Sequence, residues 1–374
     1  MLLVALAAVT LAGFLAFPTY PNYDSYYALL WGRELLHGTL PSFEAYRAPT
    51  EHPLTIAFGA LLALFGQRAD LLMVAATFVS FVALAAGMYR LGRASFGTLT
   101  GLVAAALLCT RFDIPFLAAR AYVDIPYLAV VVWAAAIEAE RPRRGTPVFV
   151  LLAVAGLMRP DAWVLSGVYW LWCLPGASWP RRAWYAALTA LGPVVWAAVD
   201  FAVTGDPLFS LTHTSGLAEE LGRSAGLSEV PGATLRFLDG LDKWPVLVAA
   251  VLGVAIALGA RLGRVRVPLA LLAVGVGTFA AVTLAGLSVI FRYLLLPAVV
   301  LLVFAAVPLT GWTLLAAGHR ARRWWAAAAG ALVLAGLVFT VTHTTPSSFA
   351  TELRFRGQSQ EALRDLLLDP RVTA

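Results

Sequence analysis

The stretch that decides the fold is 141–174, which reads RPRRGTPVFVLLAVAGLMRPDAWVLSGVYWLWCL. It opens on a cluster of arginines and continues in two apolar runs, 147–158 and 161–174, which meet at an Arg-Pro-Asp corner. Short loops rich in Lys or Arg stay on the cytoplasmic side of a membrane. An apolar run that leaves such a loop leads outward, so we expect the corner on the outer face.

The same sorting of charge continues along the whole chain. Arginine clusters interrupt the apolar sequence at Arg90 with Arg93, Arg141 with Arg143 and Arg144, Arg181 with Arg182, Arg261 with Arg264 and Arg266, and Arg320 with Arg322 and Arg323. If all of these are cytoplasmic, the chain crosses the bilayer an even number of times between consecutive clusters. The segments midway are then outside, and they are 18–52, 111–121, the corner 159–161, 204–243 and 288–292.

The composition excludes a soluble domain. Of the 374 residues, 60% are hydrophobic and only 13% are charged, so a water-soluble fold could not cover its apolar surface. The net charge of +6 would also suit a nucleic-acid binder, but the basic residues lie in the loops that membrane topology already explains. We therefore expect membrane lipid as a partner and no nucleic acid.

The apolar runs predict an all-α integral membrane protein of about eleven spanning helices. The runs are 2–17, 70–89, 97–110, 122–139, 147–158, 161–174, 183–203, 244–260, 267–288, 293–317 and 324–343. Several are shorter than the roughly 20 residues that a crossing needs, and short helices at membrane depth usually line a cavity. Residues 1–343 form the transmembrane domain, with 53–65 at the outer interface, and 344–374 form an outward-facing tail with an amphipathic helix at 359–368.

The first outer loop reads PTYPNYDSYYALLWGRELLHGTLPSFEAYRAPTEHPL from Pro18 to Leu54. Asp24 follows a Pro-Asn turn signal and could cap a helix that runs to about Leu36 and lies flat on the bilayer. The alternative to a capping role is a chemical one, because several ionisable side chains crowd this loop. They are Asp24, Glu44, Arg47, Glu51 and His52.

Several motifs, in this order, resemble the GT-C superfamily of glycosyltransferases that use polyprenyl-phosphate sugars, such as protein O-mannosyltransferases and lipid A aminoarabinose transferases. The motifs are an early acidic residue before a Tyr-rich helix, the turn Gly38 to Pro41, His52-Pro53-Leu54, Tyr122-Val123-Asp124, the corner Arg159-Pro160 and Phe291-Arg292-Tyr293. The resemblance covers about the first 165 residues and the segment around Arg292. It implies a GT-C-like bundle with interfacial helices in the first outer loop.

The resemblance implies roles for particular residues. Asp24 takes the role of catalytic base, although many relatives carry two adjacent acidic residues here and Asp24 is flanked by Tyr23 and Ser25. A departing phosphate needs cations, and a guanidinium binds phosphate oxygens through two donors. The candidates for this task are Arg292 first, then Arg47, Arg120 and Arg159. The candidates for contact with the sugar or the acceptor are Glu44, Glu51, His52, Asp124 and His213.

Several of these residues also have a purely structural explanation. Arg292 could anchor a helix end at the membrane interface, Asp124 could cap a helix, and Arg159 with Asp161 could form a local ion pair. The sequence supports no metal site, since the missing acidic partner weakens the case for a divalent ion and His213 lacks ligand spacing, although Glu44 or Glu51 could replace that partner.

The expected reaction is transfer of a sugar from a polyprenyl-phosphate donor to a hydroxyl of an envelope glycan, lipid or protein. It would take place at the outer face of a bacterial plasma membrane. The main alternative is a transporter or flippase of a lipid-linked or anionic substrate, and a silent relative that scaffolds envelope assembly is another. Transport usually relies on ionisable residues near the bilayer midplane and on repeated halves, whereas here the charges cluster at outer ends and no repeat is evident.

Overall fold

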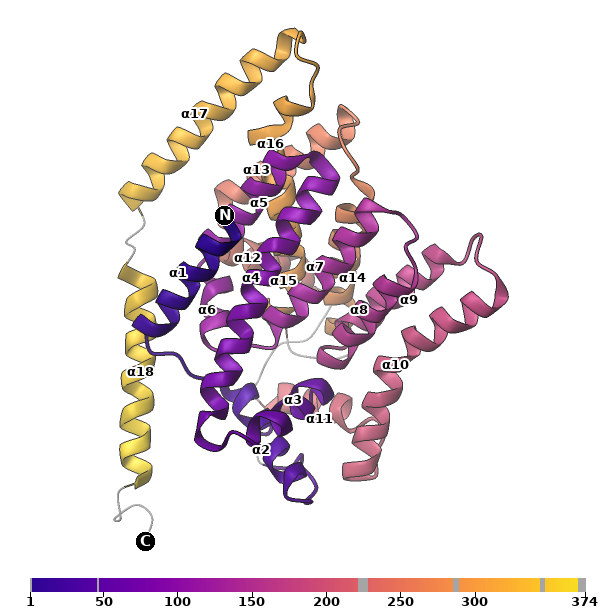
Figure 1. The fold of residues 1–374 in the computed structure, drawn as a ribbon, viewed down its shortest axis with the longest axis vertical. Helices are drawn as coiled ribbons and strands as arrows, with labels where there is room; N and C mark the ends of the chain where they lie inside the picture. The colour runs from indigo at the N-terminus through magenta and orange to yellow at the C-terminus, as the bar shows by residue number, and fades with distance from the viewer. Residues whose placement is uncertain (1, 46, 221–227, 285–288, 344–346, 369–374) are drawn as a thin grey trace.

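The computed structural model describes residues 2–45, 47–220, 228–284, 289–343 and 347–368. Throughout these residues the regular structure is helical and contains no strand, which confirms the all-α prediction (Figure 1). The helices are α1 (Leu2–Ala16), α2 (Tyr23–Leu36), α3 (Pro53–Ala63), η1 (Gly66–Arg68), α4 (Ala69–Phe96), α5 (Thr98–Thr110), α6 (Asp113–Ala119), α7 (Asp124–Glu140), α8 (Thr146–Met158), α9 (Asp161–Cys173), α10 (Trp179–Thr204), α11 (Phe209–Glu220), α12 (Glu229–Asp242), α13 (Trp244–Gly259), α14 (Arg266–Leu284), η2 (Phe291–Leu294), α15 (Leu295–Ala305), α16 (Val307–Thr310), η3 (Gly311–Leu314), α17 (Arg320–His343) and α18 (Ser347–Leu368).

By length and composition, the described residues contain four helical segments able to cross a membrane. These are Gly66–Phe96, Trp179–Thr204, Arg266–Leu284 and Phe291–Leu314. Two bent pairs raise the number to six if each pair is one span: α5 with α6, bent by 62°, and α12 with α13, bent by 107°. The helices α1, α3 and α8 are apolar but shorter. The chain therefore has the helices of a membrane protein, and the larger count of about eleven spans stays a prediction.

Three segments are more helical than the sequence suggested. The stretch 111–121 contains α6, the loop 204–243 contains both α11 and α12, and the tail helix α18 begins at Ser347 rather than near residue 359. In the long loop the sequence alone indicates a short helix at 217–221, of which residue 221 lies outside the described residues. Helix α12 escaped notice because its apolar residues form one narrow face, with Ala233, Leu238 and Leu241 buried.

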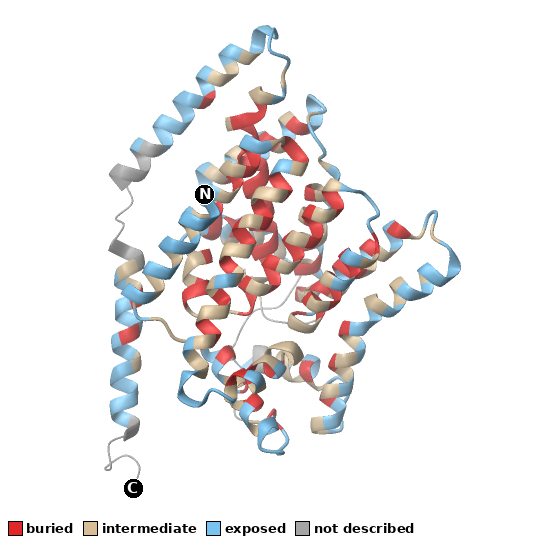
Figure 2. Cartoon of the chain, in the orientation of Figure 1, coloured by how far each residue is buried: buried red, intermediate tan, exposed pale blue. Residues whose placement is uncertain are grey.

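The centre of the bundle is α15, every residue of which is buried (Figure 2). A helix that is apolar on all sides belongs in the interior of a protein. Around it pack α13, α14 and α5, and α4 with α7 forms the neighbouring pair. Because η2 leads directly into α15, the residues of η2 lie at the edge of the buried centre of the bundle.

The first-loop helices α2 and α3 pack backbone against backbone. A Cβ atom on Gly32 would lie 2.2 Å from the backbone nitrogen of Ala60, and one on Gly59 would lie 2.3 Å from the carbonyl oxygen of Ala28. Glycine is therefore required at both positions for this approach. A small separate core that includes Trp31 and Phe43 completes the unit, so α2 is a fixed platform rather than a loose loop.

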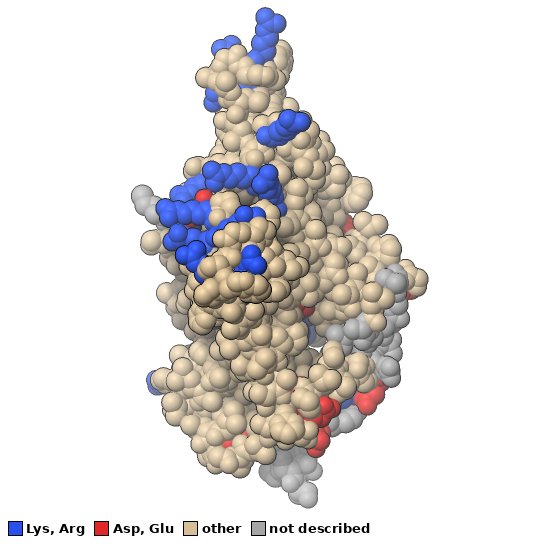
Figure 3. All heavy atoms as spheres, turned by 90° about the vertical axis from the view of Figure 1, so that its right-hand side faces the viewer, with Lys and Arg blue, Asp and Glu red and all other residues tan. Residues whose placement is uncertain are grey.

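Basic and acidic side chains gather toward opposite ends of the molecule. In Figure 1 the ends of α4 and α7, the start of α10, the α13–α14 connection and the start of α17, which together carry the arginine clusters, lie toward the upper end. The helices α2, α3 and α11 lie at the lower end. On the face drawn in Figure 3, most Lys and Arg side chains lie in the upper half and most Asp and Glu side chains in the lower half. Which end faces the cytoplasm stays a prediction.

Candidate functional site

Asp24, Arg292 and Asp124 come together at the lower end of the bundle, although they lie on α2, η2 and α7. Arg292 Nη1 donates to Asp24 Oδ2 at 2.7 Å and its Nε donates to Asp124 Oδ2 at 2.9 Å, while Nη2 lies 2.9 Å from the same Asp124 oxygen. Only 17% of the Arg292 side chain is exposed. An interfacial anchor would keep its guanidinium in water, so the structure excludes that alternative for Arg292.

Arg159 extends the same chain of alternating charges. It donates to the other oxygen of Asp124, and its Nη2 lies 2.7 Å from Asp161 Oδ2. The expected local ion pair between Arg159 and Asp161 is thus present, as part of a larger array. A buried charge is tolerated when it is paired and hydrogen-bonded, and each member of the array has a neighbour of opposite sign.

Asp24 and Asp124 do not cap their helices. The cap of α2 is Asn22, whose Oδ1 accepts a hydrogen bond from the backbone nitrogen of Ser25 at 2.9 Å. At the start of α7 no side chain caps the helix, because both oxygens of Asp124 accept from arginines. The capping alternatives are therefore wrong, and both carboxylates serve the ion array instead.

Two loops are joined so that Asp24 lies beside Asp124. The backbone nitrogen of Asn22 donates to the carbonyl oxygen of Arg120 at 2.7 Å, and Ser25 Oγ donates to that of Ala121 at 2.6 Å. The Arg120 guanidinium stacks on the Tyr20 ring at 3.9 Å and donates to the Tyr20 carbonyl. Arg120 thus holds the first loop in place and contributes no contact to the ion array.

Tyrosines that we had not assigned to the site surround the two arginines. The guanidinium of Arg292 lies 5.1 Å from the Tyr122 ring, and that of Arg159 lies 5.4 Å from the rings of both Tyr127 and Tyr293. These contacts are cation–π interactions, which hold a guanidinium over a ring face. Tyr122 and Tyr293 stand within the motifs around Asp124 and Arg292, so their position in the sequence could have indicated them.

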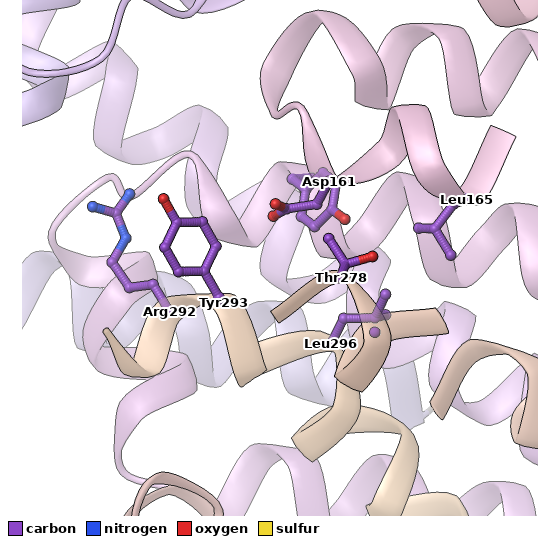
Figure 4. A pocket seen from close by; sticks show the side chains of 8 residues that line it. Asp161, Leu165, Thr278, Arg292, Tyr293 and Leu296 are labelled. Carbon is purple, nitrogen blue, oxygen red and sulfur yellow. The ribbon is translucent and has the colours of Figure 1, made fainter. Parts of the chain in front are cut away.

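A small recess with a cavity volume of about 10 Å³ opens beside the ion array (Figure 4). Its polar lining is Tyr127, Asp161, Thr278, Arg292 and Tyr293, and its apolar lining is Leu165, Gly275 and Leu296. The hydroxyls of Tyr127 and Thr278 are buried and have no hydrogen-bond partner among the residues that the structure describes. Buried polar groups are nearly always paired in proteins, so these two hydroxyls indicate a place for a polar ligand group.

Glu51 and His52 are consecutive; Glu51 is buried and His52 half-buried, and the His52 ring packs edge-on against Trp196 with ring centroids 5.7 Å apart. His52 is close enough to feel the charges of Asp24, Arg159 and Arg292, and burial lowers the pKa of its imidazole to about 4. Glu51 instead lies beside Ser210 and Asp200, and burial raises its carboxyl pKa to about 7. Neither Glu51 oxygen nor His52 Nδ1 has a hydrogen-bond partner. Of the two, only His52 belongs to the site around Arg292.

The remaining candidates lie apart from the ion array. Glu44 and Arg47 are exposed, and the Arg47 carbonyl accepts a hydrogen bond from the Tyr23 hydroxyl. His213 Nε2 lies 3.2 Å from the carbonyl oxygen of Ala48, so its ring contacts the backbone of the first loop.

A second polar group beside Glu51 was missed. Asp200 accepts hydrogen bonds from Ser210 Oγ at 2.7 Å and from the Ser210 backbone nitrogen at 2.9 Å, while Trp196 Nε1 donates to the same hydroxyl. Asp200 could have been singled out from the sequence, because an ionisable residue inside an apolar run such as 183–203 is uncommon and needs a partner.

Within the described residues, no three His, Cys, Asp or Glu side chains are gathered closely enough to hold a metal ion. Comparison of the chain with family models, with curated proteins and with solved structures finds no match. The assignment of a function therefore rests on the geometry described above.

Proposed function

We propose that this protein is a membrane glycosyltransferase that moves a sugar from a polyprenyl-phosphate donor to an acceptor hydroxyl, with Asp24 as general base. The observation that carries the proposal is the contact between Asp24 and Arg292 at the edge of an amphipathic recess. A carboxylate that can take a proton and a cation that can hold a phosphate are the two groups this reaction needs most.

The recess suits a lipid phosphate. Arg292 offers a guanidinium that can bind phosphate oxygens through two donors. The unpartnered hydroxyls of Tyr127 and Thr278 would donate to phosphate or sugar oxygens, and Leu165 and Leu296 would contact the first apolar units of the polyprenyl chain. A site with one polar and one apolar end orients such a donor in a single direction.

In the proposed transfer, one bond forms and one bond breaks at C1 of the sugar. The acceptor oxygen attacks C1 of the sugar and its proton passes to Asp24. The bond between C1 and the phosphate oxygen breaks, its electron pair stays on the phosphate, and polyprenyl phosphate leaves beside Arg292. Attack from the face opposite the phosphate inverts C1. Binding of the donor phosphate to Arg292 Nη1 would displace Asp24 and make its carboxylate available as a base, while Asp124 keeps its own contacts with Arg292.

The proposal includes a GT-C-like bundle of about eleven spans with the ion array at the outer face of the plasma membrane. Its support is the separation of the arginine-bearing helix ends from the end that holds Asp24 and Arg292 (Figures 1 and 3). An outer site would meet envelope glycans, lipids or proteins as acceptors.

A transporter or flippase is the second candidate, because two bent helix pairs and a buried array of alternating charges also occur along transport pathways. The deciding experiment incubates the protein in nanodiscs with polyprenyl-phosphate hexoses or pentoses and a pool of envelope acceptors. Mass spectrometry then measures released polyprenyl phosphate and glycosylated product. A transferase releases both in nanodiscs, where no second compartment exists. Movement of intact donor across sealed vesicles without its consumption would contradict the proposal.

A further inference from the structure

A second recess, distant in sequence from the ion array, lies where the two bent helix pairs meet. Arg111 and Asp113 stand at the break between α5 and α6, and Asp242 ends α12 at the break before α13. The recess is lined by these three residues and by apolar side chains that include Ile114, Leu241 and Val299. None of them has a role in the proposed transfer.

Asp242 is the unusual residue of this recess. The residue is 1% exposed, and no group in the described part of the chain forms a hydrogen bond with its Oδ2 atom. Arg111 lies close enough to act on the Asp242 carboxylate electrostatically, but its Nη1 donates to the Asp242 carbonyl oxygen at 2.6 Å instead. A buried carboxylate oxygen without a donor is costly to the folded state, and a water molecule or a donor group of a ligand at this oxygen would remove that cost.

Charges of both signs alternate around the recess. Asp113 lies within electrostatic range of Asp242 and of Lys243, and Arg111 stands on the other side of Asp242. The Lys243 side chain is exposed, and its Nζ donates to the carbonyl oxygen of Gly240. The four groups together carry no net charge, so they suit a ligand that itself bears one positive and one negative group.

The helices that meet at the recess are of the kinds found at the depth of lipid headgroups. Helix α12 is amphipathic, with a buried apolar face and exposed polar residues such as Arg236 and Asp239, and it meets the apolar α13 at 107°. A helix of this kind lies in the plane of the interface, while the next one enters the hydrocarbon. Trp244, 66% exposed at the start of α13, is the residue type enriched at headgroup level.

We propose that this recess binds the headgroup of a zwitterionic phospholipid with a primary amine, a phosphoethanolamine. The ammonium donates to Asp242 Oδ2 and Asp113, the phosphate lies toward Lys243 and Arg111, and the acyl chains extend over the apolar lining. The contact that distinguishes an ethanolamine from a choline headgroup is the hydrogen bond that its N–H donates to Asp242 Oδ2. A trimethylated choline headgroup carries the same charges and has no such donor.

The test compares lipids that differ in the amine alone. The full-length protein in detergent is mixed with phosphatidylethanolamine, phosphatidylcholine or phosphatidylglycerol with identical acyl chains. Native mass spectrometry counts the bound lipids, and a thermal scan gives the melting temperature. We expect one tightly held phosphatidylethanolamine and a rise of the melting temperature of at least about 2 °C with that lipid alone. Equal effects of the ethanolamine and choline lipids overturn the proposal. A parallel arm adds free phosphoethanolamine, which should compete for the same site if the headgroup alone is recognised.

Asp242→Asn and its matched control Asp239→Asn assign the site. Asp239 lies on the same helix and is exposed. Loss of a charged hydrogen bond should weaken ethanolamine-lipid binding about tenfold to a hundredfold in Asp242→Asn and leave Asp239→Asn unchanged. Without lipid, Asp242→Asn should be at least as heat-stable as the wild type, because the orphan charge is gone. Unchanged lipid binding in Asp242→Asn overturns the assignment, and Asp113→Asn provides a second variant should the first be poorly folded. Sugar transfer is not measured, so this result is separate from the proposed function.

Discussion

Asp24 and Arg292 are 268 positions apart in the chain and form an ion pair 2.7 Å long. The pair joins the first-loop helix α2 to the short η2 segment before α15. The proposed base is therefore held by the proposed phosphate-binding group. This relationship makes the two residues testable together.

Replacement of Asp24 by Asn should abolish transfer while the fold is kept. The amide can still accept a hydrogen bond from Arg292 and cannot take a proton, and the helix cap is unaffected because Asn22 provides it. Loss of a general base typically lowers the rate about a hundredfold to ten-thousandfold. Initial rates of polyprenyl-phosphate release measure this, with exposed Glu44→Gln as the first-loop control. A rate near that of the wild type in Asp24→Asn would remove Asp24 from catalysis.

Arg292→Lys should keep the positive charge and lose the paired donors, so we expect polyprenyl-phosphate binding to weaken about tenfold to a hundredfold. Arg292→Ala is a harsher change, since it leaves Asp24 and Asp124 without this cation and should cost about 3–5 kcal/mol of stability. The measurement is lipid-phosphate affinity in nanodiscs, read beside melting temperatures. Arg236→Lys, at an exposed position outside the ion array, is the control. Wild-type affinity in a folded Arg292→Lys protein would exclude Arg292 from the phosphate site.

Tyr127→Phe and Thr278→Val remove hydroxyls that have no partner in the structure. Because an unpaired buried hydroxyl contributes nothing to folding, each variant should melt at or above the wild-type temperature. If the hydroxyls contact the donor, its affinity should fall about threefold to tenfold per variant. A loss of stability without a change in donor affinity would mean that the hydroxyls have a structural partner and no ligand.

The pH dependence of stability should reveal Glu51 and His52 as opposing groups. Burial raises the Glu51 pKa from 4.5 to about 7, so its stabilising contribution is complete below pH 4.5 and is lost as the pH rises to 7. Burial lowers the His52 pKa from 6.5 to about 4, so its contribution is complete above pH 6.5 and is lost as the pH falls to 4. The two slopes largely cancel in the wild type.

Glu51→Gln should break this cancellation. The variant should gain stability at pH 8, by at most about 3 kcal/mol from 1.36 kcal/mol per pKa unit, and should then lose it on acidification through His52. Melting temperatures between pH 4 and 8 measure the difference. Parallel curves for Glu51→Gln and the wild type would show that Glu51 does not titrate in this range.

The predicted topology can be tested with single cysteines introduced into a Cys109→Ala, Cys173→Ala variant of the protein. Leu40→Cys and Leu208→Cys occupy exposed positions near the proposed outer site, and Pro142→Cys lies in an arginine-rich connection. An impermeant thiol reagent should label the first two in intact cells and the third only after permeabilisation. Labelling of the cysteine at position 142 from outside would reverse the orientation and place the ion array in the cytoplasm.

The sequence indicated which residues belong to the site but not which of them contact one another. Ionisable residues are few in this chain, so Asp24, Asp124, Arg159 and Arg292 could be singled out one by one. Their pairing could not be read, because the ion pairs of Arg292 join residues 168 and 268 positions apart. Helical membrane character follows from hydropathy alone, which is why that part of the prediction was confirmed.

Local rules failed where two residues compete for one task. Asn and Asp are about equally good helix caps, and Asn22 and Asp24 stand two positions apart, so only the tertiary partner of Asp24 decides between them.

The two hydrogen bonds from Asn22 and Ser25 to the carbonyl oxygens of Arg120 and Ala121 have a mechanical consequence. They couple the start of α2 to the turn before α7, so Asp24 and Asp124 move as one piece. Arg292 is joined to that piece through side chains and is carried by η2. When a bulky lipid phosphate separates Asp24 from Arg292, the displacement should fall on η2 and its entry into α15, while the two carboxylates keep their spacing.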